Sequence, residues 1–377
     1  MLPITRVTVT LLIGPVVAVP APAPLMEALQ GITVTTSVGS RSGFQLSFTL
    51  ANQSPLYGLL LVAANAALLA LRVIVVATVN GTPEVLTDGV ITRQEVTPGP
   101  SAGTSTLTVT GEDISTVMDR QEMNGIPYPA MPAEARVAAI LAKYAAYGVI
   151  PAVVPSLFLD VPIPVDEIPT QQGTDYAYIT ALATEVGYTF YVEAGPVPGT
   201  NLAYWGPQVK AGLVQPALSV DMGPHTNVES LTFSIAHNEK SMPVVFIHEK
   251  STKATIPIPI PDVNPLQPPL GLAPSLPSKL DFMTDTAKLS PVAALARGVA
   301  RAAASADTVE GSGTLDVVRY GRLLKARQLV GVRGAGLAFD GLYYVKSVTS
   351  TLRAGAFTQT FALSRNALIA NVPAVPV

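Results

Sequence analysis

The sequence contains no cysteine among its 377 residues. This absence excludes disulfides, thiolate-ligated zinc, iron–sulfur clusters and cysteine nucleophiles. Charged residues are also scarce, at 13% of the chain, whereas hydrophobic residues make up 49%. Since globular proteins carry roughly 25% charged residues, we expect contacts between subunits to cover much of the surface. The formal net charge of −3 provides no basic field that would attract nucleic acid.

Spacings typical of metal or catalytic sites are missing as well. The three histidines stand 11 or 12 residues apart, so no two of them form a ligand pair at metal-binding spacing. We expect ordinary surface or interface histidines at His225, His237 and His248. The sequence predicts no catalytic, cofactor-binding or metal-ligating residue and no cofactor, and we do not expect an enzyme.

Two glycine-rich stretches are interpreted as turns. Residues 39–43, Gly-Ser-Arg-Ser-Gly, resemble a nucleophile elbow only loosely, because Arg41 stands where the serine should be. Residues 331–336 lie between predicted strands rather than before a helix, which does not fit a dinucleotide-binding loop. One enzymatic alternative stays open, since Asp160 with Asp166 or Glu167 would supply paired carboxylates for hydrolysis of peptidoglycan. Solvated loop acids are the simpler interpretation.

Residues 1–24 have the composition of a secretory signal peptide, with one arginine, an apolar stretch and small residues. However, residues 6–11 alternate with a period of two, which favours a strand, and Pro15 interrupts the apolar run. Cleavage near Ala23 would instead indicate an exported protein.

Residues 57–79 are long enough to span a bilayer, which needs about 20 apolar residues. They contain Asn65 and Arg72, and an arginine near the middle of a span is costly in lipid. The character changes at Arg72 from alanine and leucine to β-branched residues. We therefore expect a short buried helix or loop that leads into a buried strand, and no membrane span.

The fold class indicated is mainly β with an α+β insert. Residues 1–112 are predicted to form a first β domain, either a sandwich or a small closed barrel. Its expected strands are 5–13, 31–38, 43–50, 71–79, 84–95 and 104–111. Residues 113–204 are predicted to form an α/β insert, with helices from about 113 to before Gly125, at 132–147 and at 175–187, and a strand at 188–192.

A second β domain is expected in two pieces, 205–250 and 308–370, with strands at 228–235, 243–248, 313–320, 328–333, 341–352 and 355–364. Residues 251–307 form an excursion between the pieces, and residues 371–377 a short tail. The excursion contains a proline-rich run at 256–277, which cannot pair in the middle of a sheet, and a predicted helix at 290–306.

Several segments, each weak alone, together resemble the late control protein D family, the hub proteins of contractile phage tails and related injection systems. A glycine, tyrosine and valine strand at 341–348, a turn, and a strand at 355–361 that closes on Arg365-Asn366 are similar to that family's last hairpin. Residues 109–114 look like the end of its first barrel. Residues 171–176 and 188–191 look like its middle domain.

The resemblance implies two similar antiparallel β-barrel domains per chain and a homotrimer that presents six barrels in a ring. Such a ring adapts a six-fold inner tube to a three-fold spike. The expected partners are tube or tube-initiator proteins, a spike that is a separate subunit, and other baseplate proteins. The expected location is a virion tail baseplate or an injection particle assembled in the bacterial cytoplasm. The alternatives are a baseplate-carried peptidoglycan hydrolase and an exported β-rich surface protein.

Overall fold

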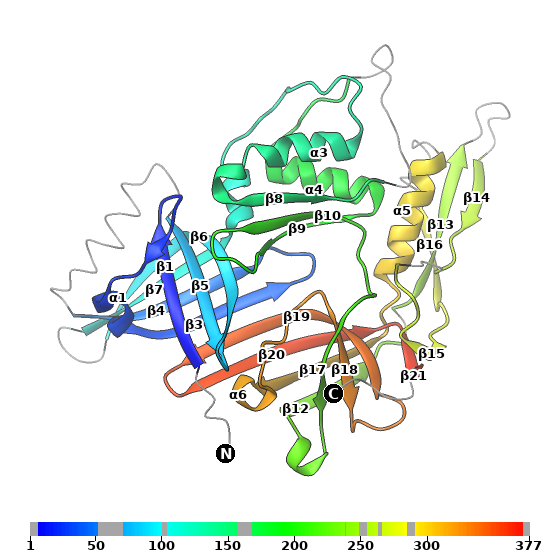
Figure 1. The fold of residues 1–377 in the computed structure, drawn as a ribbon. Coiled ribbons are helices and arrows are strands. Elements are labelled where there is room, and N and C mark those ends of the chain that lie inside the picture. The colour runs from blue at the N-terminus through cyan, green and yellow to red at the C-terminus, as the bar shows by residue number, and fades with distance from the viewer. Residues whose placement is uncertain are drawn as a thin grey trace.

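The computed structural model describes residues 7–51, 71–99, 104–156, 168–237, 239–248, 255–262, 266–284 and 291–371. Within them the chain is mainly β, as expected. One sheet of 13 strands joins segments far apart in the sequence, and nearly all its pairings are antiparallel (Figure 1). Two sets of strands make up this sheet, and we call them the first and second strand groups.

The first strand group is paired in the order β3-β4-β7-β6-β5-β1-β2. These strands follow from the alternation of apolar and polar residues in the sequence, which gives each strand one buried face. In β3, for example, Ile32 and Val34 are buried while their neighbours are less so. All six strands predicted for this part of the chain are confirmed, with ends shifted by a few residues. The strands are β1 (Val7–Gly14), β2 (Val19–Pro20), β3 (Leu29–Ser37), β4 (Gly43–Ala51), β5 (Arg72–Val79), β6 (Thr82–Pro98) and β7 (Thr104–Asp113), with helix α1 (Ala23–Ala28) before β3.

The second strand group is paired in the order β12-β17-β20-β19-β18-β11. Its strands are β11 (Val214–Ser219), β12 (Val228–Ile235), β17 (Val309–Asp316), β18 (Leu329–Arg333), β19 (Gly341–Arg353) and β20 (Ala356–Arg365), with the short helix η4 (Gly223–His225) before β12. The prediction of one strand over 313–320 is wrong in its second half. There the Asp316 carboxylate accepts a hydrogen bond from the amide of Val318 and caps helix α6 (Val317–Tyr320).

The two groups are joined edge to edge by an antiparallel ladder between β3 and β19, from Ser37 with Ser347 to Gly31 with Arg353. One hydrophobic core runs through both, from Leu11 in β1 to Leu363 in β20. Among the described strands, no ladder joins β1 to β3 or β11 to β12, so pairing leaves both groups open. The mainly antiparallel β fold is thus confirmed, but closed barrels are not observed.

The insert lies over one face of the sheet (Figure 1). Its elements are η2 (Ile114–Asp119), α3 (Ala133–Ala142), η3 (Ala145–Tyr147), β8 (Val149–Val153), α4 (Asp175–Val186), β9 (Thr189–Ala194) and β10 (Asn201–Gly206). The helix expected at 132–147 is divided into α3 and η3, and Gly148 ends η3 with φ +72°, as a C-terminal glycine does. Trp205, fully buried, anchors a separate core under both helices.

Strand β13 (Ser241–His248), expected within the second β domain, instead pairs with two strands of the excursion. The excursion itself adds β14 (Thr255–Pro259), β15 (Gly271–Pro274), β16 (Lys279–Met283) and α5 (Pro291–Ala304), and β15 pairs with β21 (Ala367–Ala370). The proline-rich β14 lies at the edge of the sheet β14-β13-β16, as its missing donors require. Helix α5 packs closely on this sheet, since a Cβ on Gly298 would meet Val245 at 2.8 Å.

The two segments that were weighed as a leader and as a membrane span, and assigned to strands instead, lie partly outside the described residues. Residues 1–6 and 52–70 are among these, and 72–79 form β5 within the large sheet. Among the helices of the described ranges, none has the length and apolarity needed to cross a membrane.

Candidate assembly surfaces and the arginine junctions behind them

The large sheet ends at β11 and at two open strand edges, those of β1 and of β12. At one end, β1 pairs with β5 over its whole length but with β2 only at Leu12 and Ile13. At the other end, β12 pairs with β17. In the described part of the chain, no strand pairs with the outer edge of Val7–Thr10 or of β12, whereas the carbonyl of Leu11 accepts a hydrogen bond from the amide of Ala21. Neither stretch contains proline, so both edges keep their N–H donors and can accept a further strand.

The edge of β14 is different, because proline blocks it. Pro257 lies opposite Phe246, and Pro259 lies opposite Val244. A proline cannot donate, so neither can occupy a hydrogen-bonded pair, and both backbone nitrogens must face away from β13. The outer edge therefore lacks donors at these positions and is a poor template for another strand.

The first junction between the insert and the sheet is built on Arg72 of β5. Its guanidinium donates to both carboxylate oxygens of Asp88 at 2.6 Å, and the two side chains are only 4% and 0% exposed. The same group donates to the carbonyls of Val16, Tyr147 and Gly199. A buried ion pair with this many partners holds the start of β8 and of β10 against the first strand group.

The second junction is at Arg327, just before β18. Its Nη2 donates to the carbonyl of Ser37 at the end of β3 at 2.8 Å. The guanidinium carbon also lies 4.0 Å from the ring centroid of Tyr191 in β9, a cation–π contact. One arginine of the second group thus contacts both the first group and the insert.

The third junction is at Arg41, in the turn between β3 and β4. Arg41 donates to Asp119 at 2.7 Å and to Glu112 at 3.3 Å, and it lies 3.7 Å over the ring of Tyr176. Burial tends to raise the pKa of Asp119, but hydrogen bonds from Thr174 and Arg41 outweigh it and lower that pKa. The turn that superficially resembled a nucleophile elbow therefore fastens the start of α4 to the sheet.

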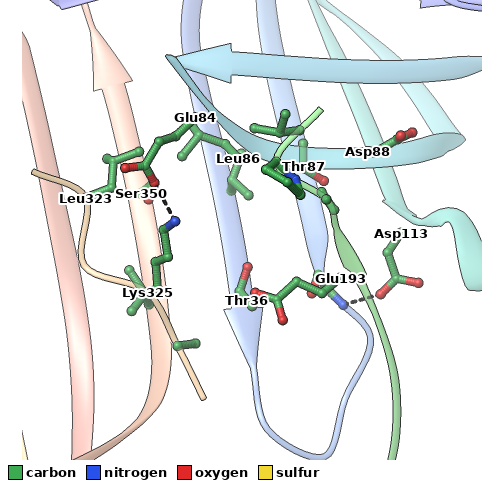
Figure 2. A pocket seen from close by; sticks show the side chains of 18 of the residues that line it. Thr36, Glu84, Leu86, Thr87, Asp88, Asp113, Glu193, Leu323, Lys325 and Ser350 are labelled. Atoms are coloured by element: carbon green, nitrogen blue, oxygen red, sulfur yellow. Dashed lines mark hydrogen bonds and ion pairs between the residues drawn. The ribbon is translucent and has the colours of Figure 1, made fainter. Parts of the chain in front are cut away.

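A cavity of about 340 Å³ opens where the three parts meet (Figure 2). Glu84 of β6 and Lys325 of the second group form an ion pair of 2.9 Å across it. Asp113 lies on its far side and accepts a hydrogen bond from the amide of Ser42 at 2.7 Å. Burial raises the pKa of Asp113 despite this bond. Glu193 points into the space from β9.

The three histidines are not gathered at one place in the described part of the structure. His225 ends η4, His237 follows β12 and His248 ends β13, and they belong to different elements. Asp160, Asp166 and Glu167 lie outside the described residues. Residues 39–43 form the turn between β3 and β4, and residues 331–336 run from β18 into a turn, both as predicted. Among the described residues, no group of three or more histidines and acids could hold a metal ion.

The segments that carried the family resemblance have structural roles. Arg365 is fully buried and donates to the carbonyls of Ala338 and Asp340, while its guanidinium lies 4.5 Å over the ring of Tyr343. Asn366 accepts a hydrogen bond from the amide of Leu270 at 2.8 Å. The end of β20 is therefore fastened both to the turn before β19 and to the excursion.

Gln171 and Asp175 organise the start of α4. Asp175 is 1% exposed and accepts hydrogen bonds from Gln171 at 2.6 Å, from Tyr144 at 2.7 Å and from Lys143 at 3.2 Å. Thr174 caps the helix by accepting from the amide of Ala177. The buried carboxylate of Asp175 is thus satisfied by several hydrogen-bond donors, as is usual for a buried polar group with a structural role.

Comparison with known proteins shows which solved structures share this fold. No protein-family model matches the sequence, and no curated protein matches it either. Among solved structures, a tail protein from Neisseria meningitidis is 14% identical with a TM-score of 0.62, covering 96% of this chain and 97% of its own. The 43 kDa tail protein of prophage MuSo2 from Shewanella oneidensis is 14% identical with a TM-score of 0.61, covering 96% and 100%.

A third structure is an Escherichia coli component of the type VI secretion system that is itself structurally similar to the bacteriophage T4 tail proteins gp27 and gp5. It is 12% identical with a TM-score of 0.51, covering 93% of this chain and 76% of its own. At these identities the likeness concerns the fold. The chain therefore has the fold of phage tail proteins and of a related secretion-system component, and the resemblance to the baseplate-hub family is confirmed at the level of the fold.

Proposed function

We propose that this protein is a structural baseplate hub of a phage tail or of a related contractile injection system. Three copies form a ring that adapts a six-fold inner tube to a three-fold spike, and no covalent bond is made or broken. The observation that carries the proposal is the pair of strand groups, β3-β4-β7-β6-β5-β1-β2 and β12-β17-β20-β19-β18-β11, fused side by side within one chain.

The number of repeating units in the proposed ring follows from the two strand groups in each chain. Three chains with two strand groups each present six similar units (3 × 2), which matches a six-fold tube on one side. The whole chain repeats only three times, which matches a three-fold spike on the other. In this proposal each group acts as one barrel-like unit. The units correspond to residues 1–112 and to 205–250 with 308–370.

The open edges supply the contacts between copies. Inside the chain, the groups already meet through strand pairing of β3 with β19. The same kind of contact between copies would join the end at β12 to the end at β1, both of which keep their donors. A head-to-tail contact of this kind closes into a ring when the rotation fits. The scarcity of surface charge agrees with faces that other subunits cover.

The remaining parts have supporting roles in this proposal. The insert, residues 113–204, is attached to the sheet through contacts of Arg41, Arg72 and Arg327. The excursion, residues 251–307, is attached to the insert through α4 and α5, where a Cβ on Gly187 would meet Ala300 at 2.5 Å. Tube, spike and other baseplate proteins are the proposed partners, with the spike as a separate subunit.

Light scattering on the purified chain tests the proposal. A hub of this kind has a mass of three times 39.2 kDa and binds a tube or spike subunit from the same source. A stable monomer that binds neither partner would overturn the proposal. Clearing of peptidoglycan in a zymogram, lost on Asp160→Asn, would favour the hydrolase alternative instead.

A further inference from the structure

One side of the large sheet carries hydroxyl groups across both strand groups. Residues opposite each other in an antiparallel ladder point to the same side of a sheet. The ladders place Thr35 of β3 opposite Thr349 of β19, and Thr349 opposite Thr360 of β20. We call this side of the sheet the hydroxyl face. It consists of Ser312 and Thr314 of β17, Thr358, Thr360 and Ala362 of β20, Ser347, Thr349 and Thr351 of β19, Thr33, Thr35 and Ser37 of β3, Gln45, Ser47 and Thr49 of β4, and Thr106, Thr108 and Thr110 of β7.

The hydroxyl face carries no charge. Of its 17 residues, 15 are serine or threonine. A protein surface with roughly 25–35% charged residues would place about four to six charges on an area of this size. On the same side of these strands, charged residues lie at the strand ends, as Glu310 and Arg353 do. Glu310 is also paired with Lys346 at 3.0 Å. The middle of the sheet is therefore a wide surface that is polar but uncharged.

This composition does not fit a contact with another protein. Protein interfaces are enriched in aromatic residues, methionine and arginine and depleted in serine, and the hydroxyl face contains none of the enriched types. Covering it would also remove many hydroxyl groups from water, which is unfavourable unless each finds a hydrogen-bond partner. The hydroxyls of Thr35 and Thr349 lie 3.1 Å apart and bond each other while exposed. The face is thus suited to stay in contact with water.

The insert lies on the opposite side of the sheet from the hydroxyl face. In β3, Val34 and Thr36 alternate with residues of the face, and in β19 Val348 and Ser350 do so. These four residues line the cavity into which Glu193 of the insert points. All residues of the hydroxyl face, by contrast, are exposed or half-buried in the described part of the chain. One side of the sheet thus carries the insert, and the other is bare.

A ring has more room on its outside than around its axis. Layers packed on a sheet lie about 10 Å from it, so the side that carries the insert fits the wider outside of the proposed ring. We propose that the hydroxyl face is the wall of the channel through this ring and that it stays hydrated in the assembly. This inference rests on the proposed trimeric ring.

The chemistry of such a wall suits a polymer that moves through the channel. Basic residues would hold a polyanion by releasing its counterions, and acidic residues would hold cationic segments in the same electrostatic way. Serine and threonine offer hydrogen bonds without either attraction. The wall therefore does not retain a charged chain that passes along it.

The absence of cysteine allows a direct test by spin labelling. One introduced cysteine per chain gives a single distance between labels in a three-fold ring, and this distance grows with the distance of the label from the axis. The positions are Thr349→Cys on the hydroxyl face and, as the control, Ala181→Cys on the exposed side of α4. Pulsed electron paramagnetic resonance measures both distances, and light scattering measures the mass of each labelled protein.

We expect a trimer in both cases and a shorter distance for Thr349→Cys. Since α4 lies at least one layer behind the sheet and three-fold geometry multiplies a difference in radius by about 1.7, the two distances should differ by at least about 17 Å. A trimer with an equal or longer distance for Thr349→Cys would overturn the channel wall and leave the ring intact. A monomer without any distance between chains would overturn the ring and the wall together.

A second variant tests the hydration of the wall. Thr35→Lys combined with Thr349→Lys adds six positive charges to a trimer (2 × 3). We expect the mass of the trimer to be unchanged and its affinity for double-stranded DNA at low salt to rise at least about tenfold over wild type. Dissociation of this variant into monomers would show that the face is a contact between copies and would overturn the proposal. An unchanged affinity for DNA would contradict a wall that a passing polymer can touch.

Discussion

Removal of Arg72 should destabilise the protein far more than removal of any surface arginine. The substitution Arg72→Met keeps much of the side-chain volume but leaves the Asp88 carboxyl, 0% exposed, without its two short hydrogen bonds. Removing one partner of a buried ion pair costs about 3–5 kcal/mol. The carbonyls of Val16, Tyr147 and Gly199 lose a donor as well, so we expect the upper half of that range.

The chain offers a matched control. Arg93 and Glu95 form an ion pair of 3.1 Å in the same strand, β6, as Asp88, but their side chains are 74% and 57% exposed. Exposed pairs contribute about 0–1 kcal/mol. The predicted difference between Arg72→Met and Arg93→Met is therefore about 3–5 kcal/mol. Removing both buried charges together, as Arg72→Met with Asp88→Leu, should cost less than Arg72→Met alone, because no unpaired charge remains.

Urea denaturation followed by the fluorescence of Trp205 measures this difference, because Trp205 is fully buried in the insert that Arg72 fastens. Hydrogen exchange of β8 and β10 reports the same junction without assuming that the whole chain unfolds in one step. If Arg72→Met and Arg93→Met shift the midpoint equally, the Arg72 junction does not hold the insert on the sheet.

Three further predictions concern the edges, pH and the excursion. Thr232→Lys places a charge on the open edge strand β12, and this charge would have to lose its water in a contact between copies. Thr255→Lys is the control, because it places the same charge on the proline-blocked strand β14. Both residues are exposed. If the charge costs about 1–2 kcal/mol of association free energy at each contact between copies, three such contacts lower the association constant of a trimer by roughly 10²–10⁴-fold. Light scattering should therefore show dissociation for Thr232→Lys only. Asp119→Asn should lower stability at pH 7, and this effect should begin to fade below about pH 4. The lowered folded-state pKa of Asp119 adds stability above the unfolded pKa, and this stability disappears as pH falls through the folded value. An unchanged difference at pH 3 would contradict this. Gly298→Leu should separate α5 from Val245 and Ile260 and increase hydrogen exchange in β13 while leaving β3 and β19 unaffected.

The strands of the large sheet could be predicted because each buries one face. The alternation of Phe44, Leu46 and Phe48 is enough to place β4, and all three are buried. Strands β8, β10 and β11 were missed for the opposite reason. They are short, and β8 and β11 each contain a proline, so neither length nor alternation distinguishes them from loop.

The junctions were less accessible to sequence reasoning. Arg72 was noticed as an arginine within an apolar run, which indicates a buried charge that needs a partner. The sequence does not show that the partner is Asp88, since that depends on the register of β5 with β6. Arg327 and Arg41 gave no signal at all, because each contacts residues brought together only by the tertiary fold. The same holds for the open edges, which are defined by what the strands leave unpaired.

The arrangement of copies in the assembled particle tests the central claim most directly. An electron-microscopy reconstruction of the tail or injection particle should show three copies of this chain in one ring at the junction of tube and spike. In that ring β12 of one copy should lie beside β1 of the next, so that six strand groups face the tube. A ring with any other number of copies, or a chain located away from that junction, would contradict the account.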